Sequence, residues 1–159
     1  MYIVIPKIKD VKECAKVYME AYQGEPWNEM YEISEVETYI GNYLNFDAKC
    51  CFALVEDDEI KGVALGFIVP SIVGDYLRIE DFCVDVNVQR KGYGSSFMNL
   101  LQQEAMKLGC DSILLGTQKD YPSYHFYLKN GFQEIESVLL YKEVEEDRLH
   151  LENGEGTSR

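Results

Sequence analysis

Apolar residues recur with two periods along this chain, and together the periods predict alternating helices and strands. Helical spacing predicts helices from a cap at Asp10 to Gly24, from Ser34 to residues 45–47, and from Gly94 to Leu108. Runs that alternate with polar residues, or that are apolar throughout, predict strands. The predicted strands are 2–8, 50–56, 59–69, 76–85 and 112–117, followed by one broken or two final strands over 132–136 and 138–144.

Short-range signals bound the helices. Two capping-box pairs predict where the first two helices begin. The pairs are Asp10 with Glu13 and Ser34 with Glu37. A fourth, short helix is expected to begin at Asp120 or Tyr121, because Pro122 suits a first turn and Gly131 suits the position after a helix end.

The order of these elements predicts a single α/β domain over residues 1–144, with a mixed central sheet and helices on both faces. A chain of 159 residues is long enough to bury a sizeable core. Gly62 and Gly66 are expected to mark bulges or close backbone contacts in their strand. Residues 145–159 have little apolar content, so we expect a polar, acidic and frayed C-terminal tail.

The charge balance bears on the partner. The net charge is −13, and the body before Glu145 still carries −10 after the tail is set aside. This disfavours a nucleic-acid partner, which needs a basic surface, and it suits a cationic small molecule or a free amine. Solubility alone also accounts for many of these charges.

Other compositional features narrow the setting. No apolar run has the length of a membrane span and the N-terminus lacks a signal-peptide pattern, so we expect a cytoplasmic protein without a membrane partner. The five cysteines form no CxxC pair and are expected to be reduced and buried. Two histidines without ligand spacing predict no metal site. A monomer and a homodimer both remain open.

The segment Gln89–Gly94 joins a predicted strand to a predicted helix and is a candidate phosphate loop. Two glycines let the backbone approach a ligand, and the free N–H groups of the helix start attract anions. Arg90 and Lys91 add positive charge, although an ordinary loop with two solvated basic residues has the same composition. A Walker A loop is excluded because its lysine follows a glycine, whereas Lys91 precedes Gly92. A dinucleotide fingerprint is excluded because it needs a third small residue where this chain has Phe97.

This loop resembles the acyl-CoA pyrophosphate loop of the Gcn5-related N-acetyltransferase (GNAT) superfamily. Residues 123–132 resemble the second signature of that family, in which Tyr127 precedes a Gly-Phe pair. The resemblance covers residues 2 to 144 and implies a GNAT-like fold whose sheet splays between strands 76–85 and 112–117. The chain departs from the family pattern at Val86, Gln89 and Asp120, and the last departure weakens one expected contact to the pantetheine arm.

The resemblance implies transfer of an acetyl group from acetyl-CoA to an amine. Free backbone groups where the sheet splays would hold the pantetheine arm, and the loop amides would hold the diphosphate. The Val84 N–H could also polarise the thioester carbonyl. The residues expected to bind the coenzyme are Cys83, Val84, Gln89, Arg90, Lys91, Gly92, Tyr93, Gly94, Ser95 and Asp120.

The resemblance also implies catalytic roles. Tyr127 is expected to protonate the departing thiolate, with an aromatic residue of the core as the alternative interpretation. Glu80 is the first choice as base and Asp81 the second, while Glu29 or no dedicated base are further options. On a regular strand Glu80 shares a face with Phe82, and a bulge would reverse the two assignments.

The loop 25–32 is the candidate acceptor wall. It contains Trp27, Glu29 and further carboxylates, a combination that suits a cation, although Trp27 could simply anchor the loop on the core. We therefore expect an acetyltransferase for a small aminoglycoside-like or polyamine-like amine. Acetylation of protein or peptide N-terminal amines and a non-catalytic acyl-CoA sensor are the alternatives, because a fold does not determine the acceptor.

Overall fold

The centre of the computed structural model, which describes residues 1–46 and 50–143, is a sheet whose strands follow the order of the chain. Within those residues the strands are β1 (Tyr2–Val4), β2 (Phe52–Glu56), β3 (Glu59–Val69), β4 (Tyr76–Val84) and β5 (Ser112–Leu115). The first four pair antiparallel, and β4 pairs parallel with β5. The mixed sheet predicted from the sequence is therefore confirmed.

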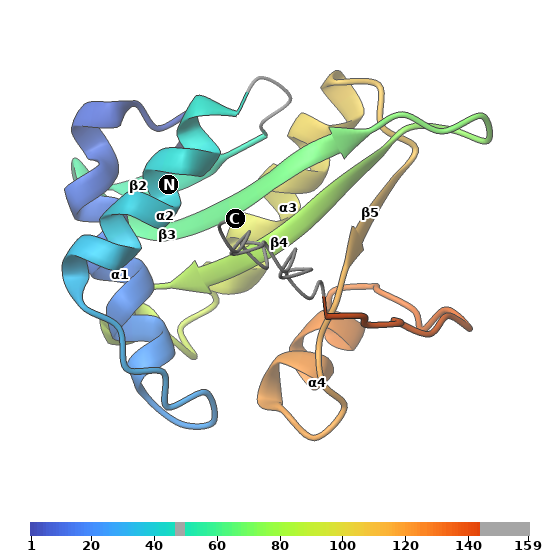
Figure 1. The fold of residues 1–159 in the computed structure, drawn as a ribbon. Coiled ribbons are helices and arrows are strands. Elements are labelled where there is room, and N and C mark those ends of the chain that lie inside the picture. Colours follow the sequence, from blue (N-terminus) through green and yellow to red (C-terminus); the bar gives the residue numbers. More distant parts are fainter. Residues whose placement is uncertain (47–49, 144–159) are drawn as a thin grey trace, which may run out of the picture.

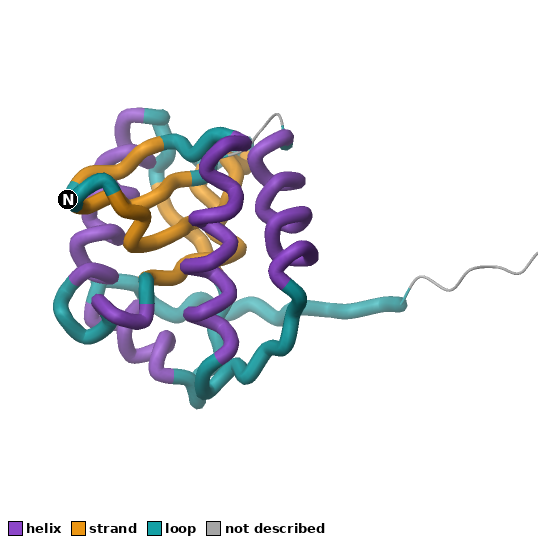
Figure 2. Tube along the Cα trace, turned by 90° about the vertical axis from the view of Figure 1, so that its left-hand side faces the viewer, coloured by secondary structure: helices purple, strands orange, loops and turns teal. Residues whose placement is uncertain are grey.

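Helices cover both faces of this sheet, as predicted. α1 (Val11–Gln23) and α2 (Ile33–Asn45) lie on one face, and α3 (Tyr93–Lys107) lies on the other (Figure 1). Viewed from the side, the strands form a layer between these helices (Figure 2). α4 (Pro122–Lys129) follows β5, and two 3-10 turns, η1 (Ile8–Asp10) and η2 (Val86–Val88), precede α1 and α3. No helix among the described residues combines the length and the hydropathy needed to cross a membrane.

The apolar stripes of the helices form a core on each side of the sheet. On one side α1 and α2 bury residues that include Tyr18, Ile40 and Leu44 against β2, β3 and Cys83. On the other side Phe97 and Leu101 of α3 are fully buried against β2 and β4. Full burial of a large apolar side chain stabilises the fold by about 1.5–3 kcal/mol, so these stripes hold the layers together.

Both predicted capping boxes are wrong. The Lys7 N–H donates to the Asp10 carboxylate at 2.8 Å and closes η1, while Glu13 accepts the Ile60 N–H at 2.8 Å and ties α1 to β3. At α2 the reciprocal pair is Glu32 with Glu35, whose carboxylate accepts the Glu32 N–H at 2.8 Å. The start of α2 at Ile33 lies one residue before the predicted cap, so this box shifts with it, whereas α1 begins after Asp10 as predicted.

A bulge interrupts β4 beside its partner β3. Leu65 pairs with Asp81 and Gly66 pairs with Ile79, which leaves Glu80 as an extra residue. A Cβ atom on Gly66 would lie 2.2 Å from the Arg78 carbonyl oxygen, so the opposite strand needs a glycine here. The expectation for Gly66 is confirmed, and residues beyond the bulge exchange faces.

The sheet opens between β4 and β5. Their pairing runs only from Tyr76 with Ser112 to Ile79 with Leu115, whereas β4 continues to Val84. The second half of β4 therefore has no neighbour on its β5 side within the described chain. This is the predicted splay, and it begins at the bulge.

The predicted final strands are wrong for the residues described. Residues 132–143 contain no strand, and Leu139 and Leu140 are 91% and 92% exposed. The segment projects from the layers as a loop (Figure 2), so its apolar pattern meets no partner strand. A strand needs a hydrogen-bonded neighbour, which a sequence pattern cannot supply. Val144 and the predicted tail 145–159 lie outside the described residues, as does Asp47 at the predicted end of the second helix.

Candidate active site

A cavity of about 740 Å³ lies where β4 and β5 diverge. Its walls come from α1, the loop 25–29, the second half of β4, the loop 89–95, the end of β5 and α4. Segments far apart in the sequence therefore meet at the opening in the sheet. A separate cavity of about 1180 Å³ lies behind β5, between α3, α4 and residues 132–139, and contains neither β4 carboxylate.

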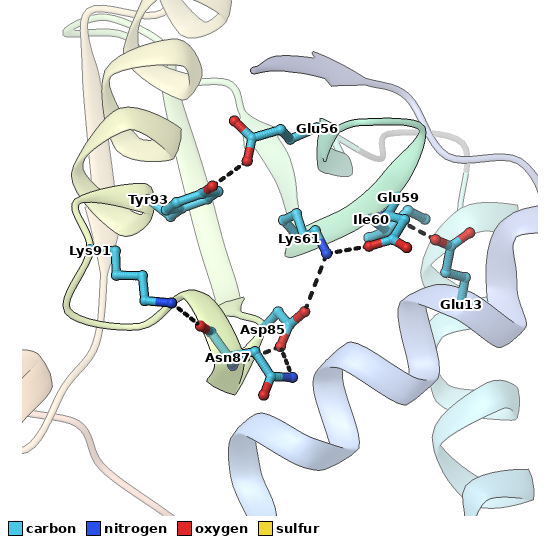
Figure 3. Close-up of polar contacts among 9 residues, drawn as sticks. All are labelled: Glu13, Glu56, Glu59, Ile60, Lys61, Asp85, Asn87, Lys91 and Tyr93. Atoms are coloured by element: carbon cyan, nitrogen blue, oxygen red, sulfur yellow. Dashed lines mark hydrogen bonds and ion pairs between the residues drawn. The ribbon is translucent and has the colours of Figure 1, made fainter.

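Most of the residues predicted to act together line the first cavity. They are Trp27, Glu29, Glu80, Asp81, Cys83, Val84, Gln89, Arg90, Gly92, Gly94, Ser95 and Tyr127. Lys91, Tyr93 and Asp120 do not line it. The Lys91 ammonium donates to the Asn87 carbonyl at 2.9 Å, and the Tyr93 hydroxyl bonds the Glu56 carboxylate (Figure 3). Both side chains thus have partners outside the cavity.

The glycine loop has the backbone that the sequence suggested. Gly92 has φ +88°, a left-handed conformation that side chains rarely adopt, and it caps α3. A Cβ atom on Gly94 would lie 3.0 Å from the Phe126 ring, so this glycine allows α4 to pack against the start of α3. The positive end of a 15-residue helix therefore borders the cavity.

Polar contacts of Asp85, joined by Lys61 of β3, brace the turn that leads from β4 into this loop. The Asp85 carboxylate accepts the Asn87 backbone N–H at 2.8 Å and its amide at 2.9 Å. The Lys61 ammonium lies 3.8 Å from the other oxygen of Asp85 and also pairs with Glu59 (Figure 3). These contacts fix η2 (Val86–Val88), from which the loop continues.

The backbone of β4 presents Val84, rather than Cys83, to the open edge. The Asp85 N–H donates to the Lys61 carbonyl at 2.9 Å, so Asp85 and Cys83 turn their backbone groups toward β3. The Val84 carbonyl accepts the Gln89 amide and the Phe82 carbonyl accepts the Tyr22 hydroxyl, both at 3.4 Å. Because N–H and C=O groups alternate in direction along a strand, the Val84 N–H points into the splay.

Tyr127 is 9% exposed and borders the cavity from α4. Its ring is held by Phe126 and Phe132 at 5.2 and 5.5 Å between centroids, and by Phe82 at 6.3 Å. Burial raises the pKa of the phenol above its usual value, and the nearby Cys83 and Asp81 groups raise it further. The hydroxyl therefore retains its proton at neutral pH and is available as a donor.

Asp81 faces α1 and α2 because of the bulge. The Tyr18 hydroxyl donates to one carboxylate oxygen at 3.0 Å and the Tyr39 hydroxyl donates to the other at 2.5 Å. Burial raises the pKa of Asp81, the two phenol hydrogen bonds lower it, and the charge of Glu80 raises it further. The balance favours a carboxylate that binds a proton more readily than an exposed aspartate.

Glu80 has a different environment. Its carboxylate accepts a hydrogen bond from the Arg78 guanidinium at 2.5 Å, on the exposed side of the bulge. Both β4 carboxylates line the cavity, but Glu80 already has a cationic partner whereas the partners of Asp81 are neutral phenols. A carboxylate neutralised by arginine is the weaker candidate for taking a proton from an amine.

An aromatic wall formed around Trp27 closes one end of the cavity. Trp27 packs edge-on against Tyr22 of α1 at 5.5 Å and against Tyr121 before α4 at 5.8 Å. The Glu29 N–H donates to the Tyr22 carbonyl at 3.0 Å, which holds the loop on α1. Burial and the charge of Asp81 raise the pKa of Glu29. The loop thus both anchors Trp27 on the core and walls the pocket.

Sequence reasoning missed the tyrosines around Asp81. Tyr18 is a buried residue of the α1 stripe and Tyr39 of α2 is 38% exposed, and neither helical pattern by itself indicates a role beside Asp81. The available signal was the residue type, since a buried tyrosine hydroxyl needs a hydrogen-bond partner that leucine or phenylalanine does not. No group of three or more potential ligand side chains in the described part of the chain could hold a metal ion.

Comparison with known proteins identifies the family. A model of the acetyltransferase (GNAT) family matches residues 12–132. The chain therefore belongs to the GNAT acetyltransferase family, which places it among the acyltransferase enzymes.

Individual relatives are distant. A tRNA(Met) cytidine acetyltransferase of Saccharolobus solfataricus is 28% identical over 88 residues, which is 48% of this chain but only 11% of that protein. A possible acetyltransferase from Clostridium difficile 630 superposes with a TM-score of 0.76 at 17% identity, covering 89% of this chain and 96% of its own. An aminoglycoside acetyltransferase from an uncultured soil metagenomic sample, in complex with sisomicin, gives 0.69 at 15% identity, covering 90% and 94%. The two structures establish the shared fold alone.

Proposed function

We propose that this chain transfers an acetyl group from acetyl-CoA to a primary amine of a small cationic molecule, of the aminoglycoside or polyamine kind. The observation that carries the proposal is the cavity at the splay, where Asp81 and Tyr127 border the same space as the glycine loop. Family membership supports the reaction type. The similar fold of an aminoglycoside acetyltransferase supports a small amine as acceptor, and the acidic body of this chain suits its charge.

The cavity residues fit a coenzyme A thioester. Gly92 exposes backbone at the α3 start, where N–H groups and Arg90 would hold the diphosphate, and Ser95 could add a hydroxyl. The outward Val84 N–H would donate a hydrogen bond to a carbonyl of the pantetheine arm or to the thioester carbonyl. The arm would then lie along β4 like an added strand. Bound there, acetyl-CoA supplies an acyl group activated for attack by an amine.

Proton handling then falls to two side chains. Asp81 takes a proton from the acceptor ammonium at a carboxylate oxygen, which exposes the lone pair of the amine. The amine nitrogen then bonds to the thioester carbon, and the carbon–sulfur bond breaks. Tyr127 gives its hydroxyl proton to the departing sulfur and regains a proton from the nitrogen as the amide forms. The contacts with Phe126 and Phe132 hold its ring at the cavity. Trp27 and Glu29 orient the cation beside Asp81. Because the bulge turns Asp81 toward the acceptor wall and Arg78 already neutralises Glu80, we assign the base to Asp81, the second choice from sequence.

The test is a panel of amines with acetyl-CoA, followed by release of the coenzyme thiol. Aminoglycosides and polyamines are expected to be turned over, whereas a peptide with a free N-terminus should be a poor acceptor. Calorimetry with coenzyme A alone tests the loop separately. Turnover of peptides in preference to the small amines would contradict the acceptor class, and absence of heat with millimolar coenzyme A would contradict the whole proposal.

A further inference from the structure

Both oxygens of Asp81 accept a hydrogen bond from a phenol, and the two phenols come from different helices. Tyr18 of α1 lies 3.0 Å from Oδ1, and Tyr39 of α2 lies 2.5 Å from Oδ2. A carboxylate oxygen has two lone pairs, so one on each oxygen remains available after these contacts. The arrangement therefore orients Asp81 without using all of its capacity as an acceptor.

Asp81 has no cationic partner within the described chain, since no ion pair includes it. The titratable groups that face it come from α1, α2, the loop 25–29, β4 and α4. They are Tyr18, Tyr22, Tyr39, Tyr43, Glu29, Glu80, Cys83 and Tyr127. Each of these groups is neutral or negative at neutral pH. Stabilisation of the Asp81 carboxylate must therefore come from hydrogen-bond donors rather than from a nearby cation.

We propose that Tyr18 and Tyr39 are positioning residues that hold Asp81 ionised and aimed at the acceptor nitrogen. The inference rests on the proposed function, in which Asp81 takes the proton of the amine. A phenol donor stabilises the carboxylate relative to the carboxylic acid, because hydrogen bonds to a charged group are stronger than those to a neutral one. Burial raises the pKa of Asp81 and the phenol hydrogen bonds lower it, so loss of one phenol donor leaves the carboxyl protonated up to a higher pH.

The geometry also links the base to both acceptor-side helices. Tyr18 packs against Tyr22 at 4.5 Å, and Tyr39 packs against Tyr43 at 5.2 Å. These ring contacts fix the hydroxyls by packing on α1 and α2, so the helix pair sets the direction of a β4 side chain. Substitution by phenylalanine keeps the rings and removes the hydroxyl donors, together with the contact between the Tyr39 and Tyr43 hydroxyls.

The first test needs no substrate. Carbon-13 NMR of the side-chain carboxyl groups follows the titration of Asp81 in the free full-length protein, with Asp81→Asn assigning the resonance. Tyr39→Phe and Tyr18→Phe are each expected to move the Asp81 titration to higher pH. Tyr76→Phe is the matched control, since Tyr76 lies on the same strand and makes no hydrogen bond to Asp81 among the bonds described. Titration of Asp81 at the same pH in the wild type and both variants would overturn the inference.

The second test uses an acceptor identified from the amine panel. Tyr39→Phe should move the acidic limb of the kcat/KM profile to higher pH and lower kcat/KM about tenfold on that limb, with the high-pH plateau within about twofold of wild type. A lower plateau with an unmoved limb would show a merely structural role and overturn the inference. If no amine is turned over, the proposed function fails while the NMR titration still decides whether the phenols hold the carboxylate.

Discussion

Removal of the Tyr127 hydroxyl separates chemistry from binding. Phenylalanine at this position retains the ring contacts with Phe126 and Phe132, and the hydroxyl makes no hydrogen bond within the described residues. The free energy of unfolding should therefore change by less than about 0.5 kcal/mol. The affinity for coenzyme A should also stay nearly constant, because the loop 89–95 that would hold the diphosphate is untouched.

The magnitude follows from the acid strengths. General acids typically contribute about 10²–10⁴-fold to the rate. Burial weakens Tyr127 as an acid, and a thiolate of ordinary pKa about 8.5 already leaves well near neutral pH. Both effects favour the lower end of the range that general acids contribute. We therefore expect Tyr127→Phe to reduce kcat about 10²-fold, equivalent to an increase of about 2.7 kcal/mol in the activation barrier.

The assay measures the released coenzyme thiol with a thiol-reactive dye. The five cysteines of the chain are buried thiols, so their own reaction with the dye should be slow. Calorimetry with coenzyme A serves as the binding control. Full turnover by Tyr127→Phe with unchanged binding would refute the role as acid, and a large loss of coenzyme affinity would show that the hydroxyl acts in binding instead.

Three further changes test separate parts of the site. Gly92→Val should weaken coenzyme A binding and destabilise the fold by about 1–2 kcal/mol, because φ +88° strains any side chain even though a Cβ meets nothing within 4 Å. Gly41→Ala in α2 is the control: its Cβ also meets nothing within 4 Å, so this change should be neutral or stabilising. Calorimetry and thermal melts compare the two variants. Trp27→Ala should raise the KM for the amine about 5–30-fold and leave the KM for acetyl-CoA unchanged, as expected from loss of about 1–2 kcal/mol of cation–π attraction, and an effect on both KM values would assign Trp27 to the fold instead. Asp81→Asn should abolish most turnover yet raise Tm at neutral pH. Burial raises the folded pKa of Asp81 above its unfolded value, so the ionised side chain destabilises the fold at high pH. The difference in Tm between the variant and the wild type should therefore vanish as the pH falls and Asp81 is protonated.

Much of the site followed from local pattern because its parts are local. The glycine loop depends on six consecutive residues, and the left-handed φ of Gly92 is a property that glycine supplies by itself. The helix after it and the aromatic turn around Tyr127 likewise depend on near neighbours. The pattern was insufficient where a distant partner decides. Glu13 bonds the Ile60 N–H of β3 instead of completing a capping box, and residues 132–143 meet no strand.

The choice between Glu80 and Asp81 depends on the bulge, and the spacing of apolar residues in β4 indicates this bulge only weakly. Leu77 and Ile79 pack toward α3, and so does Phe82, whose ring lies 5.1 Å from that of Phe97. A regular strand cannot turn residues 79 and 82 to one face, because faces alternate at every residue. One extra residue between them restores the match, and the same step sends Asp81 to the tyrosines of α1 and α2.

Cys83 makes the bulge difficult to predict from the sequence. As an apolar residue it continues the odd-numbered series of Leu77 and Ile79, so an unbulged strand looks equally amphipathic. The outcome depends on burying a phenylalanine against α3 and on satisfying an aspartate with two phenols, both of which are contacts with segments far away in the sequence. The bulge is thus stable because each face of β4 gains its own partner, and the position of Asp81 follows from core packing rather than from the strand itself.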